Sequence, residues 1–281
     1  MKSTLIGVVG AGQMGSGVAA LVALKGFNVV LVDSSLPALE QSKATITKQL
    51  QRLFPADSTI KDVGLIINCI SFQNTLSVLE GCGVVIEAIP EREELKQSLY
   101  QQLSSLLPSE VIIGTNTSSF PISELAKYLK NPKRFIGVHF MNPVLKMDLV
   151  EIIPGHLTDE DTLCFMKTFV KALEKTAVVS ADQPGFIVNR LLIPMINQAF
   201  NALESNLASK EDIDLAMEKG AAFPMGPLKL ADFIGLDTCL AIMETLNAAR
   251  SNGGNKPSEL LKRYVSEEKL GRKTREGVYK Y

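Results

Sequence analysis

The fold of this chain is decided by one stretch of sequence, Thr4-Leu-Ile-Gly-Val-Val-Gly10-Ala-Gly-Gln-Met-Gly15. A short apolar, β-branched run leads into three glycines spaced as G-x-G-x-x-G, and a helix-like stretch, residues 16–25, follows at once. A second apolar run, residues 28–32, ends in Asp33. Strand, glycine turn, helix, strand and acid in this order are typical of a dinucleotide-binding unit.

The glycine turn is suited to holding a pyrophosphate. Gly10 permits the tight turn, Gly12 lets the backbone approach the phosphates, and Gly15 lets the helix pack on the strand. Gln13 and Met14 lie in the same turn, where the free N–H groups and positive end of the helix face the phosphates. The alternative is a glycine-rich turn that serves only packing.

Asp33 indicates which dinucleotide is bound. Ser34 and Ser35 follow it, with no arginine to receive a 2′-phosphate. A carboxylate accepts hydrogen bonds from the adenosine ribose and repels a phosphate on the same ribose. We therefore predict that the cofactor is NAD rather than NADP.

Length and composition place the chain among globular enzymes. It has 281 residues, of which 46% are hydrophobic and 21% charged, enough for one large or two ordinary domains. The formal net charge of −1 argues against a nucleic-acid partner. The sequence has no long uncharged apolar run of the kind that forms a membrane helix. The four cysteines form no CxxC pair, so we expect no metal site, reduced thiols and a cytoplasmic protein.

The order of elements predicts an α/β fold with a Rossmann-like, doubly wound and mainly parallel sheet. Strand-like and helix-like segments alternate through the first two-thirds of the chain. After the first strand–helix–strand unit, the expected strands are residues 65–69, 84–88, 111–115, 134–139, 149–154 and 176–180. The expected helices in this part are residues 36–54, 93–106, 122–128 and 158–173.

The pattern changes at Asp182-Gln-Pro-Gly185, after which only helices are indicated. They cover residues 186–206, 210–220, 226–249 and 258–268. We predict an NAD-binding domain over residues 1–184 and an all-α domain for substrate binding and dimerisation over residues 185–281. Its long helices carry more apolar residues than one buried face needs, which indicates a homodimer. The alternative is that the first domain covers them.

The chain offers only two histidines as a general base. His139 ends a predicted strand, and an open α/β sheet places its ligands at the carboxyl ends of strands. Glu151 lies inside an apolar strand, where an unpaired charge is costly. We predict a His139–Glu151 pair in which the carboxylate orients the imidazole and fixes its tautomer. The alternatives are a purely structural ion pair and a carboxylate satisfied by backbone amides. His156, in a turn, is expected to be a solvated loop residue.

Two further polar sites accompany this pair. Ser118 belongs to the run Thr115-Asn-Thr-Ser-Ser119 after another strand, which can hold a substrate oxygen and the nicotinamide side of the cofactor. The same run is equally compatible with an ordinary helix cap. Asn189 stands among apolar residues, where a buried amide needs bonding partners.

Taken together, the motifs of this chain resemble the L-3-hydroxyacyl-CoA dehydrogenases, in particular the bacterial 3-hydroxybutyryl-CoA dehydrogenases. The resemblance spans essentially the whole chain, with the motifs in the same order and at matching spacings. It is carried by Gly10-Ala-Gly-Gln-Met-Gly15, Ile86-Glu-Ala88, Asn116-Thr-Ser-Ser119, His139-Phe-Met-Asn-Pro143, Leu149-Val-Glu151, Pro184-Gly-Phe-Ile-Val-Asn-Arg190, Met225-Gly-Pro227, Asp232-Phe-Ile-Gly-Leu-Asp237 and Leu270-Gly-Arg-Lys273.

This resemblance implies a role for each matching residue. His139 would be the catalytic base in oxidation and the acid in reduction, with Glu151 as its partner, and Ser118 and Asn189 would bind the reacting oxygen of the substrate. The implied NAD-binding residues are Gly10, Gly12, Gln13, Met14, Gly15, Asp33, Glu91, Lys96, Ser118, Asn142 and Lys273. The implied activity interconverts (S)-3-hydroxyacyl and 3-oxoacyl thioesters, with a short-chain acyl-CoA as substrate and a role in fatty acid metabolism.

The sequence departs from the family pattern where relatives carry a basic cluster for the 3′-phosphate of CoA. That place reads Leu53-Phe-Pro-Ala-Asp57-Ser, with only Lys48, Arg52 and Lys61 nearby. Met141, Leu145 and Asp148 replace the more usual Phe, Pro and Lys. An acyl group on an acyl carrier protein is therefore an alternative substrate.

Two other functions are compatible with the predicted fold. One is a non-catalytic NAD-binding or structural protein, against which the set Ser118, His139, Glu151 and Asn189 argues. The other is a β-hydroxyacid dehydrogenase, whose catalytic lysine in the second domain has no counterpart here in place of the histidine pair.

Overall fold

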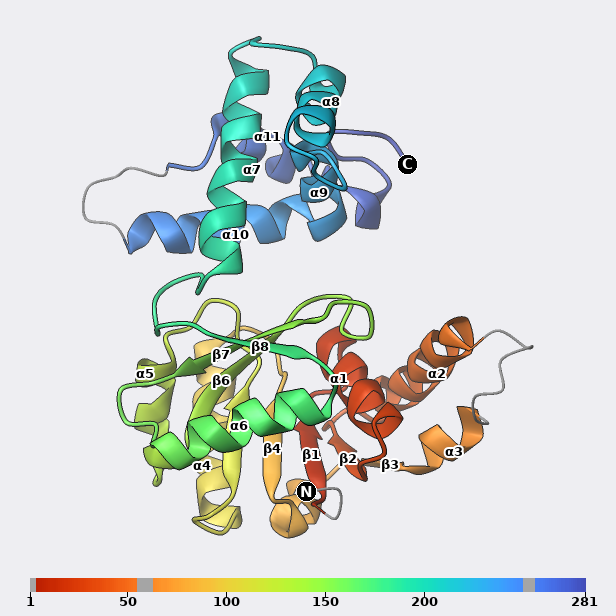
Figure 1. Ribbon diagram of the computed structural model, residues 1–281, viewed down its shortest axis with the longest axis vertical. Helices are drawn as coiled ribbons and strands as arrows, with labels where there is room; N and C mark the ends of the chain where they lie inside the picture. The colour runs from red at the N-terminus through yellow and green to blue at the C-terminus, as the bar shows by residue number, and fades with distance from the viewer. Residues whose placement is uncertain (1–3, 55–62, 250–255) are drawn as a thin grey trace. The chain divides into compact units, whose positions relative to one another are not determined.

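The computed structural model describes residues 4–54, 63–249 and 256–281 of the chain. Its contacts divide the chain after Gln183 into an N-terminal unit and a C-terminal unit (Figure 1). The first is an α/β unit and the second is helical, as the change of pattern at Asp182 indicates.

The N-terminal unit is built on one eight-stranded sheet with the order β3-β2-β1-β4-β5-β6-β7-β8. The strands are β1 (Ile6–Val9), β2 (Val29–Val32), β3 (Ile70–Gln73), β4 (Val84–Glu87), β5 (Ile112–Thr115), β6 (Phe135–Phe140), β7 (Leu149–Pro154) and β8 (Thr176–Val179). Neighbouring strands are parallel except β6 and β7. The order runs outward in opposite directions from β1 and β4, which makes their junction the switch point where such sheets bind ligands.

Helices cover both faces of this sheet (Figure 1). They are α1 (Gln13–Leu24), α2 (Leu36–Leu53), α3 (Val63–Asn68), α4 (Glu93–Leu106), α5 (Ile122–Leu125) and α6 (Glu160–Ala172), with 3₁₀ turns η1 (Leu76–Gly81), η2 (Ala126–Tyr128) and η3 (Pro132–Arg134). On β6, Val138 faces the cluster that includes Phe169 of α6. Phe135 instead packs edge-on against Tyr100 of α4, with ring centroids 5.2 Å apart. Successive strand residues thus alternate between an α1/α6 face and an α4/α5 face.

The end of the first unit is fastened to the start of α5. Asp182 accepts backbone hydrogen bonds from Ile122 and Ser123, each at 2.7 Å. The carboxylate thereby satisfies two of the N–H groups that a helix start leaves open.

The C-terminal unit contains helices α7 (Val188–Glu204), α8 (Lys210–Gly220), α9 (Pro227–Ile234), α10 (Leu236–Ala248) and α11 (Glu259–Ser266), then η4 (Arg272–Thr274). Two buried carboxylates organise it. Asp214 accepts from the backbone N–H of Leu228, at the start of α9, at 2.7 Å. Asp232 accepts from the backbone N–H groups of Val278 at 2.9 Å and Tyr279 at 2.8 Å, which ties down the C-terminal tail. Burial raises the pKa of Asp232 above its ordinary value.

The sequence-based prediction was wrong in two places. Residues 65–69 were expected to be a strand, but α3 occupies residues 63–68 and the edge strand β3 follows it. A short apolar run fits a strand or a helix equally, and here Ile66 is buried where α3 packs on α1 and α2. The single helix expected at 226–249 is broken at Gly235, whose φ of +105° ends α9 and begins α10.

No helix in the described ranges is long and apolar enough to span a membrane.

Candidate active site

The glycine turn joins β1 to α1 at the switch point. Gly10 has a φ of +106°, and a Cβ there would lie 2.6 Å from the backbone oxygen of Ala88. A Cβ on Gly15 would lie only 1.8 Å from the backbone oxygen of Gly10, so this glycine lets the helix approach the strand. A Cβ on Gly12 would meet nothing within 4 Å. Within the described part of the chain, nothing packs against this side of Gly12, so a ligand could approach the backbone there.

Asp33 follows β2 and braces this turn from the side. One carboxylate oxygen accepts from the backbone N–H of Ala11 at 2.8 Å, and the other accepts from that of Ser35 at 2.9 Å. The aspartate is half-buried. Its position beside the turn is the one in which a carboxylate contacts the adenosine ribose of a bound dinucleotide.

Four polar side chains form a row on the α4/α5 face of the sheet. Strand register pairs Glu87 of β4 with Thr115 of β5, and His139 of β6 with Glu151 of β7. Each of the four is at most 7% exposed. Glu87, Thr115 and His139 stand at the carboxyl ends of parallel strands, the edge at which open α/β sheets bind ligands.

His139 and Glu151 form the expected pair. Nδ1 of the imidazole lies 2.7 Å from a carboxylate oxygen of Glu151, which is fully buried. Because a carboxylate only accepts hydrogen bonds, this contact selects, for the neutral imidazole, the tautomer with the proton on Nδ1 and the lone pair on Nε2. This arrangement suits a general base. His156 is exposed, as expected for a loop residue.

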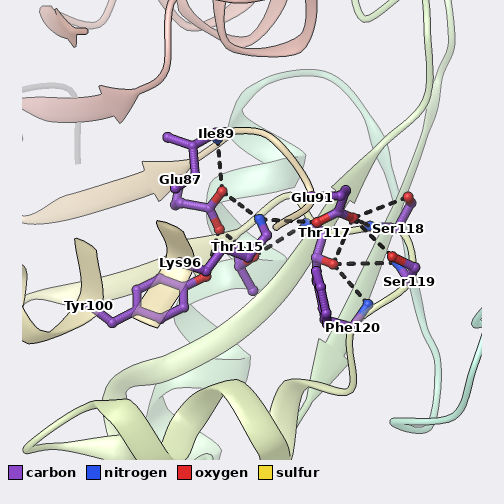
Figure 2. A network of polar contacts seen from close by, with 10 residues as sticks. All are labelled: Glu87, Ile89, Glu91, Lys96, Tyr100, Thr115, Thr117, Ser118, Ser119 and Phe120. Atoms are coloured by element: carbon purple, nitrogen blue, oxygen red, sulfur yellow. Dashed lines mark hydrogen bonds and ion pairs between the residues drawn. The ribbon is translucent and has the colours of Figure 1, made fainter. Parts of the chain in front are cut away.

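Glu91, after β4, accepts hydrogen bonds from the turn that follows β5. Its Oε1 accepts from the backbone N–H of Ser118 at 2.6 Å and from the hydroxyl of Thr117 at 2.8 Å (Figure 2). Its Oε2 lies 3.1 Å from Nζ of Lys96, whose side chain is 1% exposed. Burial pushes the pKa of Glu91 upward, but the Lys96 charge and these hydrogen bonds outweigh it and hold the pKa below its ordinary value.

Gln13 and Asn142, two further residues predicted to bind the cofactor, contact each other at the glycine turn. The side-chain amide of Gln13, at the start of α1, donates to that of Asn142, after β6, at 3.1 Å. Both belong to the first unit. Met14, next to Gln13, packs against the core cluster of this unit.

Asn189 and Lys273 lie in the second unit. Asn189 is half-buried in the first turn of α7. Lys273 lies in η4 and forms an ion pair with Asp237 at the start of α10. Within the described ranges, no group of three or more His, Cys, Asp or Glu residues is placed to hold a metal ion.

Sequence reasoning missed Glu87. Its carboxylate is fully buried and accepts a hydrogen bond from Lys96 at 2.7 Å. The signal was present, because Glu87 is a carboxylate in the apolar strand Val84-Val-Ile-Glu87 and so requires partners, as Glu151 does.

A glycine turn of the dinucleotide-binding type, an acid beside it, and a His–Glu pair along the same sheet are typical of a nicotinamide-dependent oxidoreductase. A family model described as the NAD binding domain of 3-hydroxyacyl-CoA dehydrogenase matches residues 5–183, and the model of its C-terminal domain matches residues 185–281. The chain belongs to the 3-hydroxyacyl-CoA dehydrogenase family, and its cofactor is NAD.

Individual relatives agree with the family models. A 3-hydroxybutyryl-CoA dehydrogenase from Bradyrhizobium diazoefficiens is 46% identical over 277 residues, covering 98% of this chain and 94% of the relative. The mitochondrial hydroxyacyl-coenzyme A dehydrogenase of Mus musculus is 40% identical, covering 98% and 90%. The crystal structure of (S)-3-hydroxybutyryl-CoA dehydrogenase from Ralstonia eutropha is 41% identical, with a TM-score of 0.95 and 99% of each chain covered.

Proposed function

We propose that this protein interconverts (S)-3-hydroxyacyl-CoA and 3-oxoacyl-CoA, with the short 3-hydroxybutyryl and acetoacetyl thioesters as its substrates. The observation that carries the proposal is the His139–Glu151 pair in the same sheet as the proposed NAD-binding turn. The bacterial relatives, which are 3-hydroxybutyryl-CoA dehydrogenases, support the short acyl chain.

The chemistry assigned to the chain is proton transfer and orientation. Bound NAD⁺ would supply the acceptor for the hydride that leaves C3 of the substrate. Loss of that hydride must be matched by loss of the hydroxyl proton, which Nε2 of His139 takes. Glu151 holds the imidazole through Nδ1 and stabilises the positive charge that it acquires. Ser118 and Asn189 bind the reacting oxygen.

The cofactor is assigned to the residues that surround the turn. The backbone of Gly10, Gly12, Gln13, Met14 and Gly15 binds the pyrophosphate, and Asp33 binds the adenosine ribose. Glu91, Lys96, Ser118, Asn142 and Lys273 are assigned to the nicotinamide half.

A spectrophotometric NADH assay tests the proposal. We expect oxidation of NADH with acetoacetyl-CoA, and a lower kcat/KM with the same acyl group on an acyl carrier protein. A preference for the carrier protein would reassign the substrate. NAD binding without turnover of either thioester would favour the non-catalytic alternative.

The loop that bears on the carrier, residues 55–62, lies outside the described residues, so Asp57 and Lys61 have no structural assignment. Of the nearby cations, Lys48 and Arg52 are exposed on α2. An exposed ion pair contributes only about 0–1 kcal/mol. We therefore expect CoA and 3′-dephospho-CoA to inhibit with similar strength, and a tenfold difference would show a specific phosphate contact.

We also propose a cytoplasmic homodimer built through residues 185–281. In α7, Ile193, Ile196 and Phe200 are buried within the C-terminal core, whereas Leu191 is 69% exposed. Leu192 and Met195 of the same helix are only partly buried, and a helix with apolar side chains outside its buried face suits a partner surface. The cytoplasmic location is proposed from the sequence, whose four cysteines form no CxxC pair. A monomeric mass by light scattering at micromolar concentration would contradict the dimer.

A further inference from the structure

Glu87 is enclosed by hydrogen-bond donors (Figure 2). Its Oε1 accepts from Nζ of Lys96 at 2.7 Å and from the backbone N–H of Ile89 at 2.8 Å. Its Oε2 accepts from the hydroxyl of Tyr100 at 2.6 Å and from that of Thr115 at 2.7 Å. Burial, and then the Glu87 charge, raises the pKa of Tyr100 well above its ordinary value, so this phenol stays a donor. Because every partner donates, the surroundings are complementary to a carboxylate.

Glu87 reaches the turn at residues 117–119 by an ionic route. Lys96 lies between two carboxylates, with Nζ 2.7 Å from Glu87 and 3.1 Å from Glu91. Glu91 in turn accepts the backbone N–H of Ser118. The buried ammonium therefore connects Glu87 to the segment assigned to both the substrate and the cofactor.

A second route is independent of that lysine. The hydroxyl of Thr115 donates to Glu87 and accepts from the backbone N–H of Thr117 at 3.2 Å. Both routes start at one buried carboxylate and end on adjacent residues of the same turn (Figure 2). A carboxylate that only balanced the charge of Lys96 would not need the second route.

The group also carries an excess charge. Glu87 and Glu91 supply two negative charges and Lys96 one positive charge, which leaves a net charge of −1. The group stands at the ends of β4 and β5, on the opposite side of β1 from Asp33. With the adenosine at Asp33, a dinucleotide that crosses the switch point extends its nicotinamide toward these strands.

We infer that Glu87 is a positioning residue for the nicotinamide half of the NAD site: it holds Lys96, Glu91 and the 117–119 turn, and its charge favours NAD⁺ over NADH. This inference rests on the proposed placement of the cofactor. The nicotinamide ring is positively charged in NAD⁺ and neutral in NADH, so a net charge of −1 nearby binds the oxidised form more tightly.

The test is the ratio of the dissociation constants of NAD⁺ and NADH. The chain has no tryptophan, so NADH binding can be followed by the emission of the bound dinucleotide, and NAD⁺ binding by competition. Glu87→Gln makes the group neutral, and we expect the ratio Kd(NAD⁺)/Kd(NADH) to rise about three- to tenfold, the effect of one unit charge across several ångströms of protein. A purely structural role would lower thermal stability and leave this ratio unchanged.

The matched controls separate charge from packing. Tyr100→Phe removes one hydrogen bond to Glu87 but no charge, and Glu87→Asp keeps the charge but shortens the side chain. Both should keep the wild-type ratio within about twofold. An unchanged ratio in Glu87→Gln, or an equal shift in Tyr100→Phe, overturns the inference.

If Glu87→Gln does not fold, variants of Lys96 provide a second test of the same inference. Lys96→Gln leaves a net charge of −2, so the ratio should fall, and the double variant Glu87→Gln/Lys96→Gln restores −1 and should restore the ratio. Contacts of Lys96 common to both redox forms cancel in the ratio. Failure of the double variant to restore it contradicts the role of Glu87, whereas failure of the wild-type protein to bind NAD⁺ contradicts the proposed site itself.

Discussion

The two halves of the proposed cofactor site are built by different means. The half at β1 and β2 consists of backbone N–H groups, glycines and one half-buried acid, all within residues 6–35. The other half consists of charged and hydroxyl side chains from strands β4 to β7, helix α4 and the turns after β4 and β5, most of them buried. The first half depends on shape and the second on charge balance, so substitutions should affect them differently.

The largest expected effect lies in the charged half. His139→Ala and His139→Gln should fold and bind NADH but lose about 100- to 10,000-fold in kcat, the usual contribution of general acid–base catalysis. Steady-state kinetics with acetoacetyl-CoA and NADH binding measure the two quantities. His156→Ala is the control and should retain wild-type activity, and the reverse pattern would move the site to the exposed loop.

The next effect concerns cofactor choice at Asp33. We expect kcat/KM to be about 100-fold higher with NADH than with NADPH, since a carboxylate near a 2′-phosphate costs on the order of a few kcal/mol at intermediate dielectric. Asp33→Asn should narrow this difference chiefly by improving the use of NADPH. Equal efficiency of the wild-type protein with both cofactors would contradict the assignment of Asp33.

The shape-dependent half can be tested with a pair of alanines. Gly15→Ala places a Cβ 1.8 Å from the backbone oxygen of Gly10, and such overpacking should cost about 1–3 kcal/mol of unfolding free energy. Gly12→Ala meets no neighbouring atom and should leave stability unchanged while weakening NADH binding. Urea denaturation and NADH titration separate the two effects. Equal stability loss in both variants would show that the turn is not packed as described.

The smallest effect expected is a pH dependence at Glu91. Its pKa is lower in the folded protein than in the unfolded chain, so its contribution to stability is present above its ordinary pKa and is lost as the pH falls through the folded pKa. Glu91→Gln should therefore lower the urea midpoint slightly at pH 7, and the difference should vanish in acid. A difference that grows as the pH falls would contradict this sign.

The contrast between the halves also explains what the sequence could predict. The turn at Gly10 to Gly15 and Asp33 is local, so spacing along the chain was sufficient to predict it. The His139–Glu151 pair was accessible because both residues interrupt apolar strands only twelve positions apart. The sequence could show that Glu87 needs partners but not which ones, because Lys96, Tyr100 and Thr115 meet only once a helix and two strands are assembled.

Errors in the predicted elements have the same origin. Residues 63–68 became helix α3 because packing against α1 and α2, not the local pattern, decided between two conformations of an apolar run. The break at Gly235 depends on a positive φ. A glycine permits this conformation, but a single glycine within an apolar helix pattern does not predict it.

Because strand residues alternate between the two faces, the number of residues in β6 decides which face each of its side chains occupies. Phe135 and His139 point to the α4/α5 face, and Val138 points to the other. Removing one residue before His139 would shift the register by one, turning the imidazole toward α6 and bringing Phe140 into the place opposite Glu151. The carboxylate would then be buried without its partner, so a single deletion here would combine loss of the base with a buried unpaired charge. Conservative substitutions can occur along this strand, but changes in its length cannot.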